Sequence, residues 1–152
     1  MQRKGHDPMR NYPLIILLTL LVSISGCAYI PFSGGKLKGT PTEALADWRE
    51  IASVSIIQLE TNPAQPYSVN IWMIAEQARL YVFAGDNYAQ WVQNIESNQS
   101  VRLQAEGKVY DLHAYRVTDP DEYLSFTHAW NKKYESDRTD SDVQENYLFR
   151  LE

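Results

Sequence analysis

The stretch 79–117, RLYVFAGDNYAQWVQNIESNQSVRLQAEGKVYDLHAYRV, contains the changes of hydrophobic period that decide the fold. Its first run, RLYVFA at 79–84, is rich in β-branched and aromatic residues and predicts a strand that ends at Gly85. Apolar residues then recur at helical spacing from Tyr88 to Ile95, which predicts a helix ending near Asn98. The remainder returns to a period of two and predicts a hairpin that turns at Glu106-Gly107.

The sequence on the N-terminal side of this stretch predicts a helix and two strands. Thr40-Pro41-Thr42-Glu43 combines a capping residue, a proline and a glutamate in the order typical of a helix start. A helix of about ten residues is therefore expected from Thr40. Alternating runs at 54–59 and 67–74 then predict two strands, joined by the turn-rich loop 61–66.

The sequence on the C-terminal side predicts another helix and a last strand. Asp119-Pro120-Asp121-Glu122 begins a helix that carries an aromatic stripe, and 147–151 alternates as a strand does. The whole chain then contains six short, mostly antiparallel strands and about three helices. This composition indicates a single small α+β domain built on a closed or nearly closed β-barrel.

A short apolar run precedes Cys27, the only cysteine in the chain. Three basic residues lie before Pro13–Ile24, and this pattern is typical of a secretory signal. The run has twelve residues, whereas a transmembrane helix needs about 20. Ile24-Ser25-Gly26-Cys27 resembles the lipobox of bacterial lipoproteins, which implies cleavage before Cys27 and acylation of that residue. The alternatives are an uncleaved membrane anchor with an inert Cys27, or ordinary cleavage nearby.

The lipobox resemblance sets the expected domain organisation. Residues 1–26 are the predicted lipoprotein signal peptide, 27–39 a lipidated flexible tether rich in glycine and lysine, and 40–152 the barrel domain. The predicted partner is a membrane, reached through the lipid on Cys27. Because Ala28 follows the cysteine, the resemblance implies the outer membrane, facing the periplasm. The tether from Ala28 to Gly39 could reach at most about 40 Å.

The charge of the mature chain excludes one class of partner. Removal of residues 1–26 would leave 11 basic and 18 acidic side chains, a net charge near −7. Nucleic-acid binding depends on neutralising phosphates with lysine and arginine, so no nucleic-acid partner is expected. No metal site is expected either, because His113 and His128 have no second histidine or cysteine at ligand spacing. Hydrolase and phosphate-loop motifs are also missing from the sequence.

Several short segments in order resemble the split β-barrel of flavin-binding proteins, a group that includes pyridoxamine-phosphate-oxidase-like proteins and deazaflavin-dependent nitroreductases. The segments are Leu80–Phe83, Trp91–Asn98, Val101–Leu103, Gly107–Tyr110 and Arg116–Glu122. The resemblance covers roughly 48–152, and it departs from the nitroreductase pattern at Ile95 and Gln99, where leucine and proline are usual. It implies a split barrel, an FMN or deazaflavin cofactor, and a homodimer with the cofactor at its interface.

The positions that hold cofactor phosphates in such proteins lack cations here. The loop between the first two strands, Thr61–Pro66, has no glycine, lysine or arginine, and its two prolines have no amide donor. The start of the middle helix, Asn87–Trp91, also has no cation. The sequence therefore favours the absence of a cofactor, with FMN or deazaflavin as the alternative.

The candidate ligand site rests on the position of a barrel cleft in the resembling fold. The residues predicted there are Ser68, Asn70, Gly85, Asp86 and Trp91. The many aromatic residues of the domain are interpreted mainly as core, or else as walls for a flat apolar ligand or a docked partner. The first functional hypothesis is a non-catalytic envelope lipoprotein that binds a ligand or an envelope protein. The second is a membrane-tethered flavin or deazaflavin oxidoreductase.

Overall fold

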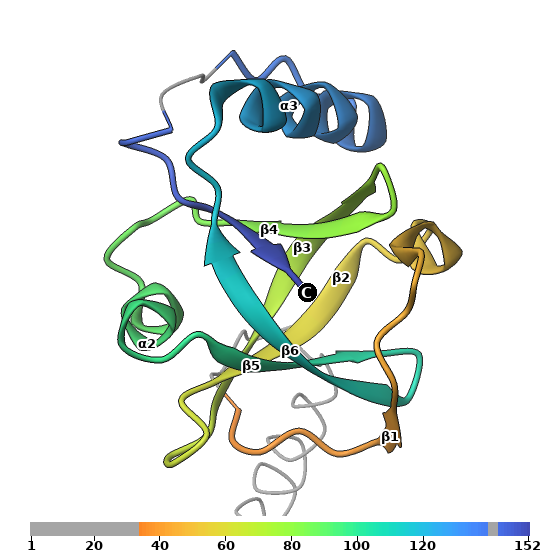
Figure 1. Cartoon of the computed structure of the whole chain (residues 1–152), viewed down its shortest axis with the longest axis vertical. Coiled ribbons are helices and arrows are strands. Elements are labelled where there is room, and N and C mark those ends of the chain that lie inside the picture. The colour runs from red at the N-terminus through yellow and green to blue at the C-terminus, as the bar shows by residue number, and fades with distance from the viewer. Residues whose placement is uncertain (1–33, 140–142) are drawn as a thin grey trace, which may run out of the picture. The chain divides into compact units, whose positions relative to one another are not determined.

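The computed structural model describes residues 34–139 and 143–152 (Figure 1). The described elements are β1 (Thr40–Thr42), the 3-10 helix η1 (Trp48–Ile51), β2 (Ile56–Thr61), β3 (Tyr67–Glu76), β4 (Arg79–Phe83), α2 (Gln90–Ser97), β5 (Ser100–Ala105), β6 (Lys108–Arg116), α3 (Pro120–Tyr134) and β7 (Leu148–Leu151). The predicted signal peptide and Cys27 lie outside the described residues. Within the described part, no helix is long and apolar enough to cross a membrane.

Six antiparallel strands close into a barrel, which confirms the predicted α+β fold. The strands follow one another around the barrel in the order β6-β5-β2-β3-β4-β7, and β7 pairs back onto β6. The long strand β6 makes this closure possible because its two halves have different partners. Lys108–Tyr110 pair with the extra strand β1, and Ala114–Arg116 pair with β7. β3 is divided similarly, with Tyr67–Trp72 on β2 and Met73–Glu76 on β4.

Two hydrophobic clusters hold the domain together. The larger one fills the barrel with inward-facing strand residues such as Leu59, Leu103 and Met73, closed at one side by Trp91 and Ile95 of α2. The smaller one lies between the outer face of the β3–β4 region and α3, and it includes Ile74 and Phe126. In Figure 1, α3 lies across one end of the barrel and α2 lies at its side.

The predicted helix from Thr40 is wrong. Thr40–Thr42 is a strand that pairs in parallel with β6, and the only helical segment of this region is η1, which begins after Asp47. The Asp47 carboxylate accepts a hydrogen bond from the Arg49 amide, so it performs the capping role that the sequence assigned to Thr40. Local cap chemistry at 40–43 was overridden because the edge of β6 offered backbone partners.

Residues 34–39 do not form a flexible tether, contrary to the prediction for 27–39. Gly34 pairs with Ser68, and both of their amides donate to the opposite carbonyl. Leu37 is buried, and its amide donates to the Glu60 carboxylate, which is itself 3% exposed and paired with Arg102. We call residues 34–42 the strap, since they run along the barrel and are bonded to it at both ends.

Candidate functional site

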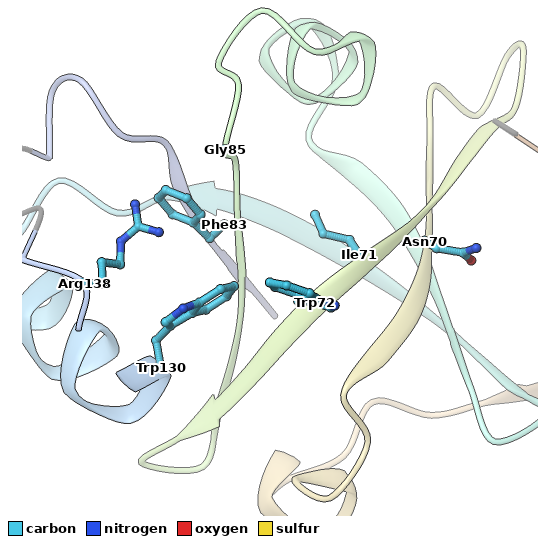
Figure 2. Close-up of a pocket in the computed structure, with 7 residues that line it drawn as sticks. All are labelled: Asn70, Ile71, Trp72, Phe83, Gly85, Trp130 and Arg138. Atoms are coloured by element: carbon cyan, nitrogen blue, oxygen red, sulfur yellow. The ribbon is translucent and has the colours of Figure 1, made fainter. Parts of the chain in front are cut away.

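An open pocket with aromatic walls lies where β3 and β4 face α3. It has a volume of about 370 Å³. Its lining residues, drawn in Figure 2, are Asn70, Ile71, Trp72, Phe83, Gly85, Trp130 and Arg138. We call it the aromatic pocket. The rings of Trp72, Phe83 and Trp130 come from β3, β4 and α3, so three elements distant in sequence build the walls.

Trp72 is a large apolar side chain that remains half-exposed at the pocket. Its side chain points outward from β3 and is 52% exposed. It stacks on Tyr134 with ring centroids 5.3 Å apart and an interplanar angle of 21°, and it lies 5.8 Å from Trp130. Because Trp130 and Tyr134 are four residues apart on one helix, their rings lie on the same face of α3. The contacts hold Trp72 in place while leaving apolar surface for a ligand.

The C-terminal end of α3 is fixed to the barrel by two polar side chains. The Lys133 ammonium donates to the carbonyls of Val54 and Met73 at 2.6 and 3.0 Å, and burial lowers the pKa of Lys133. The Tyr134 hydroxyl donates to the Met73 and Ser55 carbonyls at 2.8 and 3.0 Å. These bonds occupy the Met73 carbonyl in the divided region of β3 and two carbonyls just before β2, and they place Trp130 opposite Trp72.

The N-terminal end of α3 is fixed by Glu122. Its carboxylate accepts two 2.9 Å hydrogen bonds from Arg150, one of 2.8 Å from the Tyr81 hydroxyl and one from Arg79. Burial raises the pKa of Glu122, but the bonds from Arg150 and Tyr81 outweigh burial and the net pKa is lowered. Burial and the bond to Glu122 raise the pKa of Tyr81 to about 12. A charged carboxylate therefore ties α3 to β4 and β7.

The segment after α3 places Arg138 against the pocket. The Asn131 side chain holds this segment, because its amide nitrogen donates to the Arg138 carbonyl at 2.9 Å and its oxygen accepts the Arg138 amide at 3.0 Å. The Arg138 guanidinium lies 3.6 Å from the centre of the Phe83 ring, which is a cation–π contact. Figure 2 shows Arg138 and Phe83 on the same side of the pocket.

A second pocket joins the two segments in which the sequence lacked phosphate-binding cations. It has a volume of about 390 Å³ and is lined by Asn62, Gln65, Pro66, Tyr67, Gln90 and Asn94. The first three belong to the β2–β3 loop and the last two to the first turns of α2. Four of the six side chains end in carboxamides and none of the six carries a charge. We call this the amide pocket.

The structure brings together only part of the predicted site. Asn70 and Gly85 line the aromatic pocket, although the Asn70 side chain points away from the rings (Figure 2). Ser68 is buried against Gly34 in the strap, Asp86 accepts a hydrogen bond from the Tyr88 amide, and Trp91 is 8% exposed in the barrel core. These three do not line the aromatic pocket. The five had been predicted together because the resembling fold places a barrel cleft at their positions.

The sequence did not predict Trp72, Trp130 or Arg138 as site residues. We call Trp72 and Trp130 the ring pair. Trp72 and Trp130 belong to aromatic patterns interpreted mainly as core, and no local signal distinguishes a ring that faces a pocket from one that fills a barrel. Arg138 lies in a polar loop without periodicity. No group of three or more potential metal ligands is found among the described side chains.

Comparison with known proteins identifies the fold. No protein-family model matches the chain, and no curated protein matches its sequence. Solved structures do match it. One is a protein assigned as a pyridoxamine 5′-phosphate oxidase from Listeria innocua, with 11% identity and a TM-score of 0.52, covering 66% of this chain and 84% of that one. Another is a FAD-binding protein from Mesorhizobium loti, with 20% identity and a TM-score of 0.50, covering 68% and 82%.

A third similar structure is a protein assigned to 5-nitroimidazole antibiotic resistance from Bacteroides thetaiotaomicron. It has 12% identity and a TM-score of 0.53, covering 70% of this chain and 80% of that one. At these identities the likeness concerns the fold alone. The chain therefore has the split β-barrel fold of these structures, which is the fold that the sequence resemblance implied.

The amide pocket does not fit the phosphate of a flavin nucleotide. A phosphate needs cations or several convergent backbone amides to replace its hydration. The lining side chains are neutral, and Pro66 contributes no backbone donor. The aromatic pocket, by contrast, has the apolar walls that a flat ring requires. Of the two pockets, the aromatic one suits a flat ring, and the amide pocket lacks the cations that a phosphate requires.

Proposed function

We propose that this chain is a lipid-anchored protein of the bacterial cell envelope whose split barrel binds a flat, largely apolar ligand without catalysing a reaction. The single observation that carries the binding proposal is the aromatic pocket, in which Trp72 is half-exposed and held by contacts with Trp130 and Tyr134. The neutral amide pocket argues against a phosphorylated flavin as that ligand.

The anchor is the acylated Cys27, and the expected location is the outer membrane, on its periplasmic side. Six residues lie between Cys27 and Gly34, where the strap is bonded to β3, so seven Cα–Cα steps join the two. An extended segment of this length spans about 25 Å, which is shorter than the reach of a tether extending to Gly39. The lipid would therefore hold the barrel close to the membrane surface. A homodimer or an envelope protein partner is compatible with this position.

The second candidate is a membrane-tethered oxidoreductase that uses FMN or deazaflavin. The observation in its favour is the fold itself, because similar folds occur in a FAD-binding protein and in a protein assigned as a pyridoxamine 5′-phosphate oxidase. In this alternative the ring of the cofactor would occupy the aromatic pocket.

Ligand titration of the full chain in detergent distinguishes the two candidates. The probes are lumichrome, an uncharged tricyclic ring, and FMN and a deazaflavin, which carry phosphate. We expect lumichrome to quench tryptophan fluorescence, and Trp72→Ala to weaken its binding by about tenfold. Tyr88→Ala is the matched control, since Tyr88 is 88% exposed and does not line the pocket. FMN or deazaflavin binding at micromolar or lower concentration would instead contradict the first candidate and support the oxidoreductase candidate.

A further inference from the structure

The amide pocket has a chemistry that neither the lipid anchor nor the binding of a flat ring uses. Its walls come from two elements that are held in a fixed relation by a chain of hydrogen bonds. The Gln90 amide donates to the Asn94 side-chain oxygen at 2.9 Å, and the Asn94 amide donates to the Thr61 hydroxyl at 2.9 Å. The Thr61 hydroxyl in turn bonds to the Tyr67 carbonyl at 3.3 Å.

Burial makes this chain of bonds specific. The Thr61 side chain is fully buried and Asn94 is only 9% exposed, so both must keep their partners to avoid an unsatisfied polar group. Their orientation is therefore set before any ligand arrives. Gln90, at the exposed end of the chain of bonds, is held by Asn94 and retains its carbonyl oxygen and one N–H for a ligand.

The opposite wall is a rigid turn. The Gln65 amide donates to the Asn62 carbonyl at 3.0 Å, and Asn62 has a positive φ of 54°, a conformation that asparagine tolerates better than most residues. Pro63 and Pro66 restrict the backbone further. Within the described part of the chain, the carboxamides of Asn62 and Gln65 make no hydrogen bond, so the turn presents them to the pocket.

These groups match one class of ligand. A carboxamide donates and accepts at once, and so does a hydroxyl group, whereas an anion would meet no positive charge and lose its hydration. The Tyr67 ring and the Pro66 ring add apolar surface beside the amides. Several neutral hydroxyl groups on a compact ring would satisfy both features.

We propose that the amide pocket is a binding site for a neutral saccharide. Asn62, Gln65 and Gln90 hydrogen-bond its hydroxyl groups, Asn94 positions Gln90, and Tyr67 and Pro66 contact the apolar face of the sugar ring. The site is separate from the aromatic pocket, because the two sets of lining residues have no member in common.

The test is a titration of the ¹⁵N-labelled full chain, in a detergent without a sugar headgroup, with maltotriose, chitotriose and inorganic phosphate. We expect at least one trisaccharide to shift backbone amide signals of 61–67 and 90–94, and phosphate to leave them unchanged. Asn62→Ala and Gln90→Ala should each weaken that binding by about fivefold or more. Gln58→Ala is the matched control, since it removes an exposed carboxamide outside both pockets.

Three results would overturn the proposal. The first is that neither trisaccharide shifts these signals at concentrations that saturate weak sugar sites, on the order of 10 mM. The second is that phosphate shifts them as strongly as a sugar does. The third is that binding survives both Asn62→Ala and Gln90→Ala but is lost in Trp72→Ala, which would place the sugar in the aromatic pocket.

Discussion

Trp91 lies inside the barrel and Trp72 lies on its outer surface, although both belong to amphipathic segments. Trp91 faces the barrel from α2 and packs 5.7 Å from Phe149, whereas Trp72 points outward from β3 and remains half-exposed. The alternation of β3 places Trp72 on the same face as Asn70, but it does not say whether that face is the outer one. That α3 would cover only part of that face, leaving a pocket, depends on where α3 packs.

Gln90 is the position at which a single substitution should let the amide pocket bind a phosphate. Gln90→Lys places a cation at the first residue of α2, on the wall of a pocket whose lining side chains are otherwise neutral. We expect the affinity for FMN relative to riboflavin to rise by roughly tenfold. Gln93→Lys adds the same charge on α2 outside the pocket and should leave the ratio unchanged. Fluorescence titration of the two flavins measures it, and equal ratios for both variants would contradict the expected role of Gln90.

At the scale of elements, α3 forms a wall of the aromatic pocket, and polar contacts fix it at both ends. Glu122 ties its first turn to β4 and β7, while Lys133 and Tyr134 tie its last turn to β3 and to the segment just before β2. Between them, Phe126 and Trp130 pack on Tyr81 and Phe83. Loss of the contacts at either end of α3 would therefore move one wall of the aromatic pocket.

Because of the Glu122 contacts, the free energy of unfolding should fall as the solution becomes acidic. Because the pKa of Glu122 is lowered on folding, the folded state binds fewer protons, and its contribution is present above about pH 4.5 and lost as the pH falls through the lowered pKa. Glu122→Gln should lower the free energy of unfolding by about 1–3 kcal/mol at neutral pH, and by less as the pH falls towards 3. Urea unfolding across this range measures the difference. A constant difference at every pH would show that the charge of Glu122 contributes nothing.

The strap requires a glycine at position 39. A Cβ there would lie 2.7 Å from both the Gly107 carbonyl oxygen and a Val109 methyl group, so the strap or the hairpin would have to move. We expect Gly39→Ala to lower the free energy of unfolding by about 1–3 kcal/mol, with earlier proteolysis of the strap. Gly35→Ala meets no atom within 4 Å and should have little effect. The two variants are compared by urea unfolding, and equal stability would contradict the close approach.

At the scale of the whole molecule, Cys27 is the residue on which the proposed location depends. Cys27→Ser removes the only thiol that could carry a glyceryl lipid. We expect complete loss of labelling by radioactive palmitate and release of the protein from the membrane fraction, because a single modified residue supplies all the acyl chains. Labelling that survives the substitution would contradict the lipoprotein assignment and leave the ligand proposals unaffected.

The barrel could largely be predicted from the sequence, while its two pockets could not. Hydrophobic period and turn residues are local, so β4, α2, β5 and β6 were predicted nearly to their ends. The strand at Thr40–Thr42 was missed because its hydrogen-bonding partners are Lys108–Tyr110, and local cap residues carry no information about them. The same holds for the ring pair of Trp72 and Trp130.

By itself, the sequence determined the α+β barrel, the neutral composition of the β2–β3 loop and of the first turns of α2, and the lipobox-like segment. Each of these depends on residues close together in the chain. Only the tertiary structure decided that the strap is bonded to the barrel, that the loop meets α2 in one amide pocket, and that Trp72 faces Trp130. The reason is that strand pairing and helix packing join distant segments, and the best partner for a side chain depends on the whole arrangement.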